Sequence, residues 1–156
     1  MLLELRDVTV EYPTPGRDTS TLKALDHLSL SIEAGEAVCV IGPSGCGKST
    51  ALRLASGLAK PTEGEVLAHG ERITGPRDDC ALILQDYGLL PWMNVYKNAE
   101  LGLSVRGVEK EERRRRTLEA LERVGLAGFE KAWPSELSGG MQQRLALARA
   151  VAMQAD

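Results

Sequence analysis

The sequence has no long apolar run, little aromatic content, few cysteines and no excess of either charge. Nothing in its 156 residues approaches the roughly 18 apolar residues of a membrane-spanning helix, and Glu4 and Arg6 interrupt any signal-peptide core. The 22 acidic residues nearly balance the 19 basic ones, which gives no electrostatic basis for nucleic acid as the main partner. Cys39, Cys46 and Cys80 lack metal-type spacing and are expected to be reduced thiols. We therefore expect one cytoplasmic domain, the number that a chain of this length suggests.

The most informative motif is GPSGCGKST at residues 42–50, which fits the phosphate-loop pattern G-x-x-x-x-G-K-[ST]. An apolar run at residues 37–41 predicts a buried strand before it, and residues 49–58 predict a helix after it, with Leu52, Ala55 and Leu58 on one side. The glycines let successive backbone N–H groups turn toward an anion, and the helix N-terminus adds a partial positive charge. Lys48 would reach the β- and γ-phosphates, and the Ser49 hydroxyl would bind Mg²⁺.

The rest of the chain predicts an α/β fold around this loop. Residues 3–12 alternate with one change of phase at Arg6-Asp7, which predicts an edge strand with a bulge, and residues 28–32 alternate again. A small hairpin is expected at residues 65–73. A second apolar run at residues 80–84 ends at Gln85 and predicts a parallel, covered strand. The phosphate loop and Gln85 would then both lie at carboxyl ends of a mostly parallel sheet, where ligands bind.

Four aromatic residues suggest contact surfaces. Tyr12, at the end of the first strand, either packs on its own sheet or forms a platform for a base. Tyr87, Trp92 and Tyr96 cluster around a loop that contains Gly and Pro. This loop is either a docking surface for a partner, as aromatic anchors often are, or a segment anchored in its own domain.

A charged helix is predicted over residues 109–124, ending at Gly125. The run of arginines at residues 113–116 is consistent with a nucleic-acid or lipid site, but acid-first pairs four residues apart favour a solvated face instead. The expected pairs are Glu111–Arg115, Glu112–Arg116 and Glu119–Arg123. The expected buried side of this helix consists of Leu118, Leu121 and Val124.

Ser138, followed by two glycines, begins the last predicted helix and forms a second N-terminal anion site in principle. Ser-Gly-Gly alone is a weak signal. Behind it, the helix has an apolar face made of Met141, Leu145, Ala148 and Ala152.

Together these motifs resemble the ATP-binding-cassette family over essentially the whole chain, in order and in spacing. The segment that matches the Walker A motif consists of Gly42, Pro43, Ser44, Gly45, Cys46, Gly47, Lys48, Ser49 and Thr50. The segment that matches the signature consists of Leu137, Ser138, Gly139, Gly140 and Met141. Gln85 matches the Q-loop glutamine, and Tyr12 matches the aromatic residue that stacks on adenine. Met141, where Gln is usual, and residues 88–92 look like importer ATPases of the nitrate, sulfonate and taurine group.

The resemblance implies a β-rich part and P-loop NTPase core at residues 1–93, in which an N-terminal antiparallel β part accompanies a mostly parallel sheet. It also implies a helical subdomain at residues 94–137 and a signature helix at residues 138–156. The implied cofactors are ATP and Mg²⁺, with Lys48 and Gln85 catalytic and with Ser49 and Gln85 as metal ligands. Two subunits would close head to tail, so that the signature of one chain serves the ATP bound by the other. A permease would dock at residues 87–92 on the inner face of the cell membrane, with a periplasmic or lipoprotein solute-binding protein in the assembly.

The sequence ends at Asp156, where the family continues into the Walker B strand. The resemblance implies that the Mg²⁺-binding Asp, the catalytic Glu, the D-loop and the switch histidine are not in this sequence. We expect the N-terminal part of a cassette, with its C-terminal core strands missing, marginally folded and without steady ATPase activity alone. The alternatives are a non-catalytic nucleotide-binding fragment and a non-transport cassette. A P-loop kinase would have no use for the signature segment.

Overall fold

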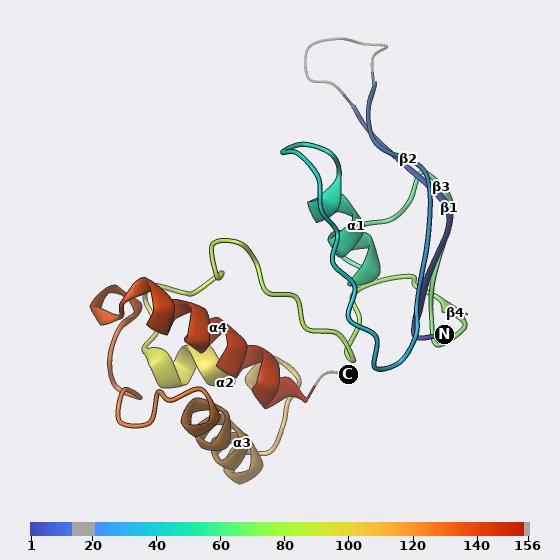
Figure 1. Cartoon of the computed structure of the whole chain (residues 1–156). Helices are drawn as coiled ribbons and strands as arrows, with labels where there is room; N and C mark the ends of the chain where they lie inside the picture. Colours follow the sequence, from blue (N-terminus) through green and yellow to red (C-terminus); the bar gives the residue numbers. More distant parts are fainter. Residues whose placement is uncertain (14–20, 155–156) are drawn as a thin grey trace. The chain divides into compact units, whose positions relative to one another are not determined.

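The computed structural model describes residues 1–13 and 21–154 and divides into two compact units, Met1–Arg77 and Asp78–Asp156. We call them the sheet unit and the helical unit (Figure 1). Each has its own buried apolar cluster. They are described separately below.

The sheet unit contains one antiparallel sheet with the strand order β2-β1-β3-β4. Its strands are β1 (Leu3–Pro13), β2 (Thr21–Ile32), β3 (Glu63–Ala68) and β4 (Glu71–Arg72). The predicted hairpin is confirmed as β3 and β4. The predicted bulge is confirmed at Asp7, which has a φ of 50°: the register of β1 shifts there against both neighbouring strands, β2 and β3. The prediction that β1 is an edge strand is wrong, because β1 pairs with both β2 and β3. Buried Val8, Thr9 and Val10 fit this central position.

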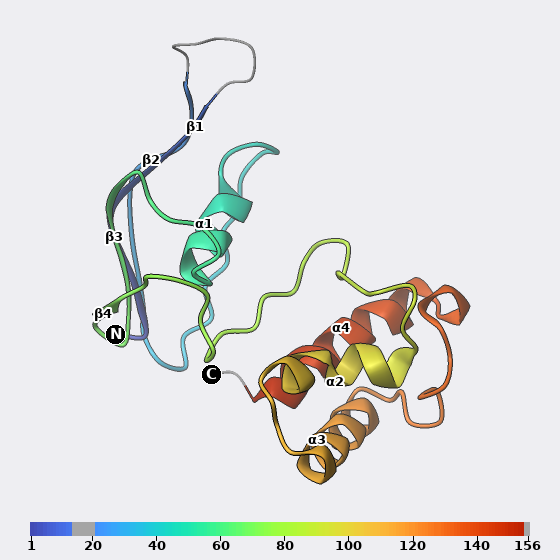
Figure 2. The same cartoon turned by 180° about the vertical axis from the view of Figure 1, so that it is seen from behind.

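Helix α1 (Lys48–Ala55) packs on one face of this sheet, as Figures 1 and 2 show. Its buried residues are Thr50, Ala51 and Leu54, and Leu54 is only 1% exposed. Of the residues predicted to share one side, Ala55 packs against the core, whereas Leu52 is 53% exposed and Leu58 is 57% exposed. The helix also ends before Leu58, because Gly57 adopts a left-handed φ of 74°.

The predicted parallel strands at residues 37–41 and 80–84 do not form among the described residues. A strand needs a neighbour to satisfy its backbone groups, and within residues 1–13 and 21–154 neither run has a paired strand. Their side chains are accordingly exposed: Ile41 is 87% exposed and Leu84 is 46% exposed. The observed sheet is the expected N-terminal antiparallel part of the α/β fold, and neither expected parallel strand is present among the described residues.

The helical unit packs three helices around one apolar core. They are α2 (Val95–Val105), α3 (Lys110–Arg123) and α4 (Gly139–Met153), with a short 3₁₀ helix η1 (Pro134–Glu136) before α4. The predicted apolar face of α4 is confirmed: Leu145, Ala148 and Ala152 are buried, and Met141 packs against the same core. In α3 the buried residues are Thr117, Ala120 and Leu121, whereas Leu118 is 37% exposed. The predicted buried side of α3 is therefore confirmed at Leu121 and at Val124, which packs against the core, and is wrong at Leu118.

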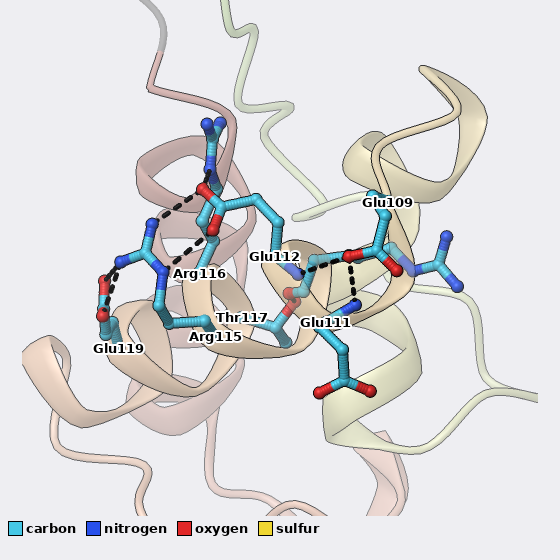
Figure 3. Close-up of polar contacts among 8 residues, drawn as sticks. Glu109, Glu111, Glu112, Arg115, Arg116, Thr117 and Glu119 are labelled. Carbon is cyan, nitrogen blue, oxygen red and sulfur yellow. Dashed lines mark hydrogen bonds and ion pairs between the residues drawn. The ribbon is translucent and has the colours of Figure 1, made fainter.

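In the arginine run of α3, Arg114 and Arg115 are exposed, as predicted, whereas Arg113 is half-buried and its Nε pairs with the buried Glu100 carboxylate at 3.1 Å. Arg115 forms ion pairs with Glu112 and Glu119, both at 2.7 Å, and Arg116 pairs with Glu112 at 2.6 Å (Figure 3). Hydrogen bonds from Arg115 and Arg116 lower the pKa of Glu112 to about 2. Of the three predicted pairs, Glu112–Arg116 is confirmed. Arg115 pairs with Glu112 and Glu119 instead of Glu111, and Glu119 thus pairs with Arg115 instead of Arg123.

Across residues 1–13 and 21–154, no helix combines the length and the apolar character needed to cross a membrane.

Candidate phosphate-binding site

The phosphate loop, residues 42–50, is fixed to the sheet unit at Gly47. This glycine has a left-handed φ of 93°, and a Cβ atom there would lie 2.4 Å from the Ala24 carbonyl oxygen and 2.6 Å from Leu25 Cδ2. Only a residue without a side chain can therefore hold the loop this close to β2. Gly45, with a φ of 84°, also requires a left-handed backbone but has open space around it. Gly47 thus sets the path of the loop by its packing against β2, whereas Gly45 sets only the local backbone conformation.

The N-terminus of α1 follows directly and suits an anion. Gly47 caps the helix with its backbone alone, no side chain accepts from the first turn, and that turn contains no acidic residue. Ser49 is exposed and Thr50 is buried, so the Ser49 hydroxyl remains accessible. Uncapped N–H groups and the helix dipole at one loop fit a phosphate, and an accessible hydroxyl beside them fits the role of an Mg²⁺ ligand.

Lys48 lies against the same loop. Its Nζ donates to the carbonyl oxygens of Gly42 at 2.8 Å and Pro43 at 2.7 Å, and lies 3.5 Å from Cys46 Sγ. The ammonium group is thus held within the loop by two short hydrogen bonds. Cys46 is exposed. Cys39 is exposed as well, which corrects its expected burial in a strand.

Tyr12 lies on β1 in the same unit, in register with Leu22 of β2. The Tyr12 side chain is 39% exposed and Leu22 is 65% exposed. The aromatic ring is therefore at an open end of the sheet, and its role as a platform for a base stays a prediction.

Gln85 lies in the helical unit, exposed, at the start of a loop with an unusual backbone. Tyr87 and Gly88 both adopt left-handed φ angles, 64° and 53°. Their carbonyl oxygens accept hydrogen bonds from Arg149, at 2.7 Å from Nη2 to Tyr87 and 2.8 Å from Nη1 to Gly88. Burial lowers the pKa of the Arg149 guanidinium. The sequence analysis missed Arg149, although a cation beside Ala148 and Ala152 on the apolar face of α4 was a usable signal.

Asn98 anchors the other end of this loop and was also missed. The side chain is fully buried, and its Oδ1 accepts from the Leu90 N–H at 2.8 Å. Its Nδ2 lies 2.8 Å from the Met93 carbonyl oxygen and 3.1 Å from that of Leu90. Of the two interpretations left open for the aromatic loop, anchoring in its own unit is therefore observed. Trp92 nevertheless remains 69% exposed.

The signature segment forms the N-terminus of α4. The Ser138 Oγ accepts from the Met141 N–H at 3.3 Å and so caps the helix. Gln142 Nε2 donates to the Pro134 and Leu137 carbonyl oxygens at 2.9 and 3.3 Å, which fixes the approach to the helix. A Cβ atom added at Gly139 or at Gly140 would have no other group within 4 Å.

The structure groups the predicted site residues by unit. The phosphate loop and Tyr12 belong to the sheet unit, and Gln85 and the signature segment belong to the helical unit. The two proposed Mg²⁺ ligands, Ser49 and Gln85, are therefore on different units. The described part of the chain contains no group of three or more His, Cys, Asp or Glu side chains suited to a metal ion.

Comparison with known proteins places these motifs in a family. The profile of the ABC transporter family matches residues 25–156. The nitrate import ATP-binding protein NrtD of Synechocystis is 48% identical over 129 residues, which covers 83% of this chain and 48% of the relative. The Fe(3+) ions import ATP-binding protein FbpC of Pasteurella multocida is 49% identical over 133 residues, 83% of this chain and 38% of the relative. The taurine import ATP-binding protein TauB of Sinorhizobium fredii is 43% identical over 152 residues, 96% of this chain and 56% of the relative.

A solved structure gives the same result for the fold. The dimeric ATP-binding cassette MJ0796, bound to ADP and Pi in a post-hydrolysis state, aligns with a TM-score of 0.85 and 36% identity. The alignment covers 99% of this chain and 71% of that one. The chain spans about half the length of the curated relatives that it matches first, 49% and 50%. The phosphate loop, the capped signature helix and these matches agree, and the chain belongs to the ABC transporter family.

Proposed function

We propose that this chain is part of the ATP-binding subunit of an ABC importer, which couples ATP binding and hydrolysis to solute uptake through a membrane permease. The observation that carries the proposal is that one chain contains two such helix N-termini. The phosphate loop leads into α1, whose N-terminus has no side-chain cap, and Ser138 caps α4, whose approach is fixed by the hydrogen bond of Gln142 to Pro134. In this proposal Lys48 and the loop amides bind the phosphates, Ser49 and Gln85 bind Mg²⁺, and Tyr12 stacks on the base. ATP supplies the phosphoryl group.

The two glycines of the signature segment support a role outside their own chain. Gly47 is required by its own surroundings, because a Cβ would meet the Ala24 carbonyl at 2.4 Å. The glycines at 139 and 140 are not: neither has a positive φ, and neither would place a Cβ near any other group. Glycine also allows another molecule to approach the backbone closely. We propose that the signature segment contacts the phosphates of ATP held by a second copy of the subunit.

The proposed assembly contains a second copy of the subunit, a permease and a solute-binding protein. Two copies form a head-to-tail dimer, which accords with the dimeric state named for the MJ0796 cassette. Exposed Trp92 and its anchored loop, residues 87–92, form the permease-docking segment. The assembly then lies on the cytoplasmic face of the membrane and works with a solute-binding protein. Within this cassette, residues 1–93, 94–137 and 138–156 form the core, the helical subdomain and the signature helix.

The proposed solutes are those of the nitrate, sulfonate and taurine group. Met141 and the loop at residues 88–92 favour that group in the sequence. Relatives named for nitrate and taurine import match this chain, but the relative named for Fe(3+) import matches at equal identity. The solute therefore rests on the Met141 and residue 88–92 features alone, and uptake assays with nitrate, taurine and Fe(3+) in a strain lacking the subunit separate the candidates.

Nucleotide binding by single-site variants tests the proposal. Lys48→Ala should abolish ATP binding, because the loop loses its only side-chain cation. Ser138→Arg should leave binding by the monomer intact, because the signature segment belongs to the other unit and serves a second copy. ATP binding that survives Lys48→Ala would refute the assignment of the loop. ATP binding without any hydrolysis by the complete subunit would instead support the alternative, a non-catalytic nucleotide-binding protein.

A further inference from the structure

The half-buried Arg149 lies on α4, the helix whose N-terminus is the signature segment. Its neighbours Leu145, Ala148 and Ala152 are all buried. A guanidinium placed beside them must have its donors satisfied, since an unpaired buried charge is costly. The partners are two successive carbonyl oxygens, those of Tyr87 and Gly88, at 2.7 and 2.8 Å.

The turn that Arg149 holds does not stabilise itself well. Tyr87 has a φ of 64° and Gly88 a φ of 53°, and a left-handed conformation is unfavourable for a residue with a side chain. The local hydrogen bonds are few: the Tyr87 N–H donates to the Leu84 carbonyl at 3.0 Å, and the Gly88 N–H donates to Asp86 Oδ1 at 3.3 Å. The bidentate contact with Arg149 therefore supplies the restraint that the turn lacks.

Beyond the turn, the loop is fixed to α2 by buried Asn98, which binds the backbone of Leu90 and Met93. Leu89 packs against the core that α2 and α4 share. The segment that follows Gln85 thus has one anchor on the signature helix and one on α2. Both helices belong to the helical unit.

We propose that Arg149 is a positioning residue that locks the left-handed turn after Gln85 onto the signature helix, so that the Gln85 loop and Ser138 move as one body. The inference rests on the proposed function for the roles of Gln85 and Ser138, but the lock itself does not depend on nucleotide. A movement transmitted to exposed Trp92 would then reach the N-terminus of α4 through Arg149 and Asn98, without passing through the phosphate loop.

Arg144 provides a matched control on the same helix. Its Nη1 donates to the carbonyl oxygens of Val124 and Gly125 at 3.0 and 3.3 Å, at the C-terminal end of α3. Like Arg149, it joins α4 to a loop by contact with two successive carbonyls. Unlike Arg149, it is exposed, and its hydrogen bonds go to the backbone at residues 124–125 and not to the turn at residues 87–88.

Hydrogen exchange of the whole chain without nucleotide, resolved to single amides, tests the lock. Arg149→Gln should speed exchange at the amides of Tyr87 and Gly88 by about tenfold, because the closed turn loses two hydrogen bonds from a charged donor. Arg149→Lys should give an intermediate effect, since lysine keeps the charge but lacks the planar fork by which Nη1 and Nη2 of the guanidinium each reach one carbonyl. Arg144→Gln should speed exchange at Gly125 and Leu126 and leave residues 87–93 unchanged.

The inference is overturned if Arg149→Gln leaves the Tyr87 and Gly88 amides unchanged, or if Arg144→Gln affects them equally. It is also overturned if Arg149→Gln and Arg149→Lys speed exchange evenly over α2, α3 and α4, because Arg149 would then support the whole unit and not the turn. Failure of the proposed function would appear elsewhere, as ATP binding that does not need Lys48, and would leave the exchange result standing.

Discussion

Replacing Gly47 by alanine tests whether the phosphate loop is held by packing against β2. The new Cβ would lie 2.4 Å from the Ala24 carbonyl oxygen, and the residue would have to keep a φ of 93°. Gly45→Ala is the matched control, because its φ is 84° and a Cβ there would meet nothing within 4 Å. Both variants carry the conformational cost of a left-handed alanine, about 1–2 kcal/mol.

The difference between the two variants isolates the clash. Forcing a methyl group into a packed site costs about 1–3 kcal/mol, and a backbone carbonyl moves less readily than a side chain. Gly47→Ala should therefore lower the free energy of unfolding of the sheet unit by about 1–3 kcal/mol more than Gly45→Ala. The same variant should weaken ATP binding, because the loop must move away from β2 to relieve the contact.

Urea unfolding followed by circular dichroism, together with ATP titration, measures both effects. Equal loss of stability in the two variants would show that the contact between Gly47 and Ala24 does not constrain the loop. Unchanged ATP affinity in a destabilised Gly47→Ala variant would show that the position of the loop against β2 is irrelevant to binding.

Three further predictions follow from the packing and charges of each unit. Leu54→Ala, at a side chain only 1% exposed, should lower the free energy of unfolding of the sheet unit by about 2–5 kcal/mol in thermal or urea unfolding. Leu52→Ala on the same helix, at 53% exposure, should lower it by less than about 1 kcal/mol. The lowered pKa of Glu112 means that its ion pairs stabilise α3 above pH 4.5 and are lost as the pH falls toward about 2; Glu112→Gln should flatten this part of the pH–stability curve, and Glu111→Gln should leave it unchanged. Cys46 and Cys39, both exposed, should react with a maleimide faster than the less exposed Cys80, and ATP should protect Cys46 alone in peptide-resolved mass spectrometry; protection of Cys39 and Cys46 to the same degree would argue against binding at the loop.

Local patterns predicted much of what positions the site. The glycines and Lys48 defined the phosphate loop, and Ser138 with the apolar face of Leu145 and Ala152 defined the capped α4. These features depend on residues close in sequence, so short motifs contain them. The same holds for the hairpin of β3 and β4, which a His-Gly turn determines.

Other features depend on neighbours that a short pattern does not contain. Apolar residues at 37–41 have the composition of a buried strand, but a strand forms only beside a partner, and the described residues provide none. Leu52 and Leu118 fit a helical period and still face outward, because the packed side of each helix is set by what lies against it. Arg149 is informative only once the carbonyls of Tyr87 and Gly88 are known to face it.

The central claim is that Lys48 of one chain and Ser138 of another serve the same ATP, and mixing two inactive variants of the complete subunit tests it most directly. Lys48→Ala and Ser138→Arg should each be inactive alone. In a head-to-tail dimer containing one copy of each, one site combines both damaged residues, while the other combines an intact Lys48 with an intact Ser138. ATP hydrolysis should therefore reappear on mixing. Each mixed dimer keeps one intact site of two, and random pairing makes about half of the dimers mixed, so about a quarter of the activity of the unaltered dimer is expected. If Lys48 and Ser138 instead act on one ATP within a single chain, every site in the mixture carries a damaged residue, and no activity returns.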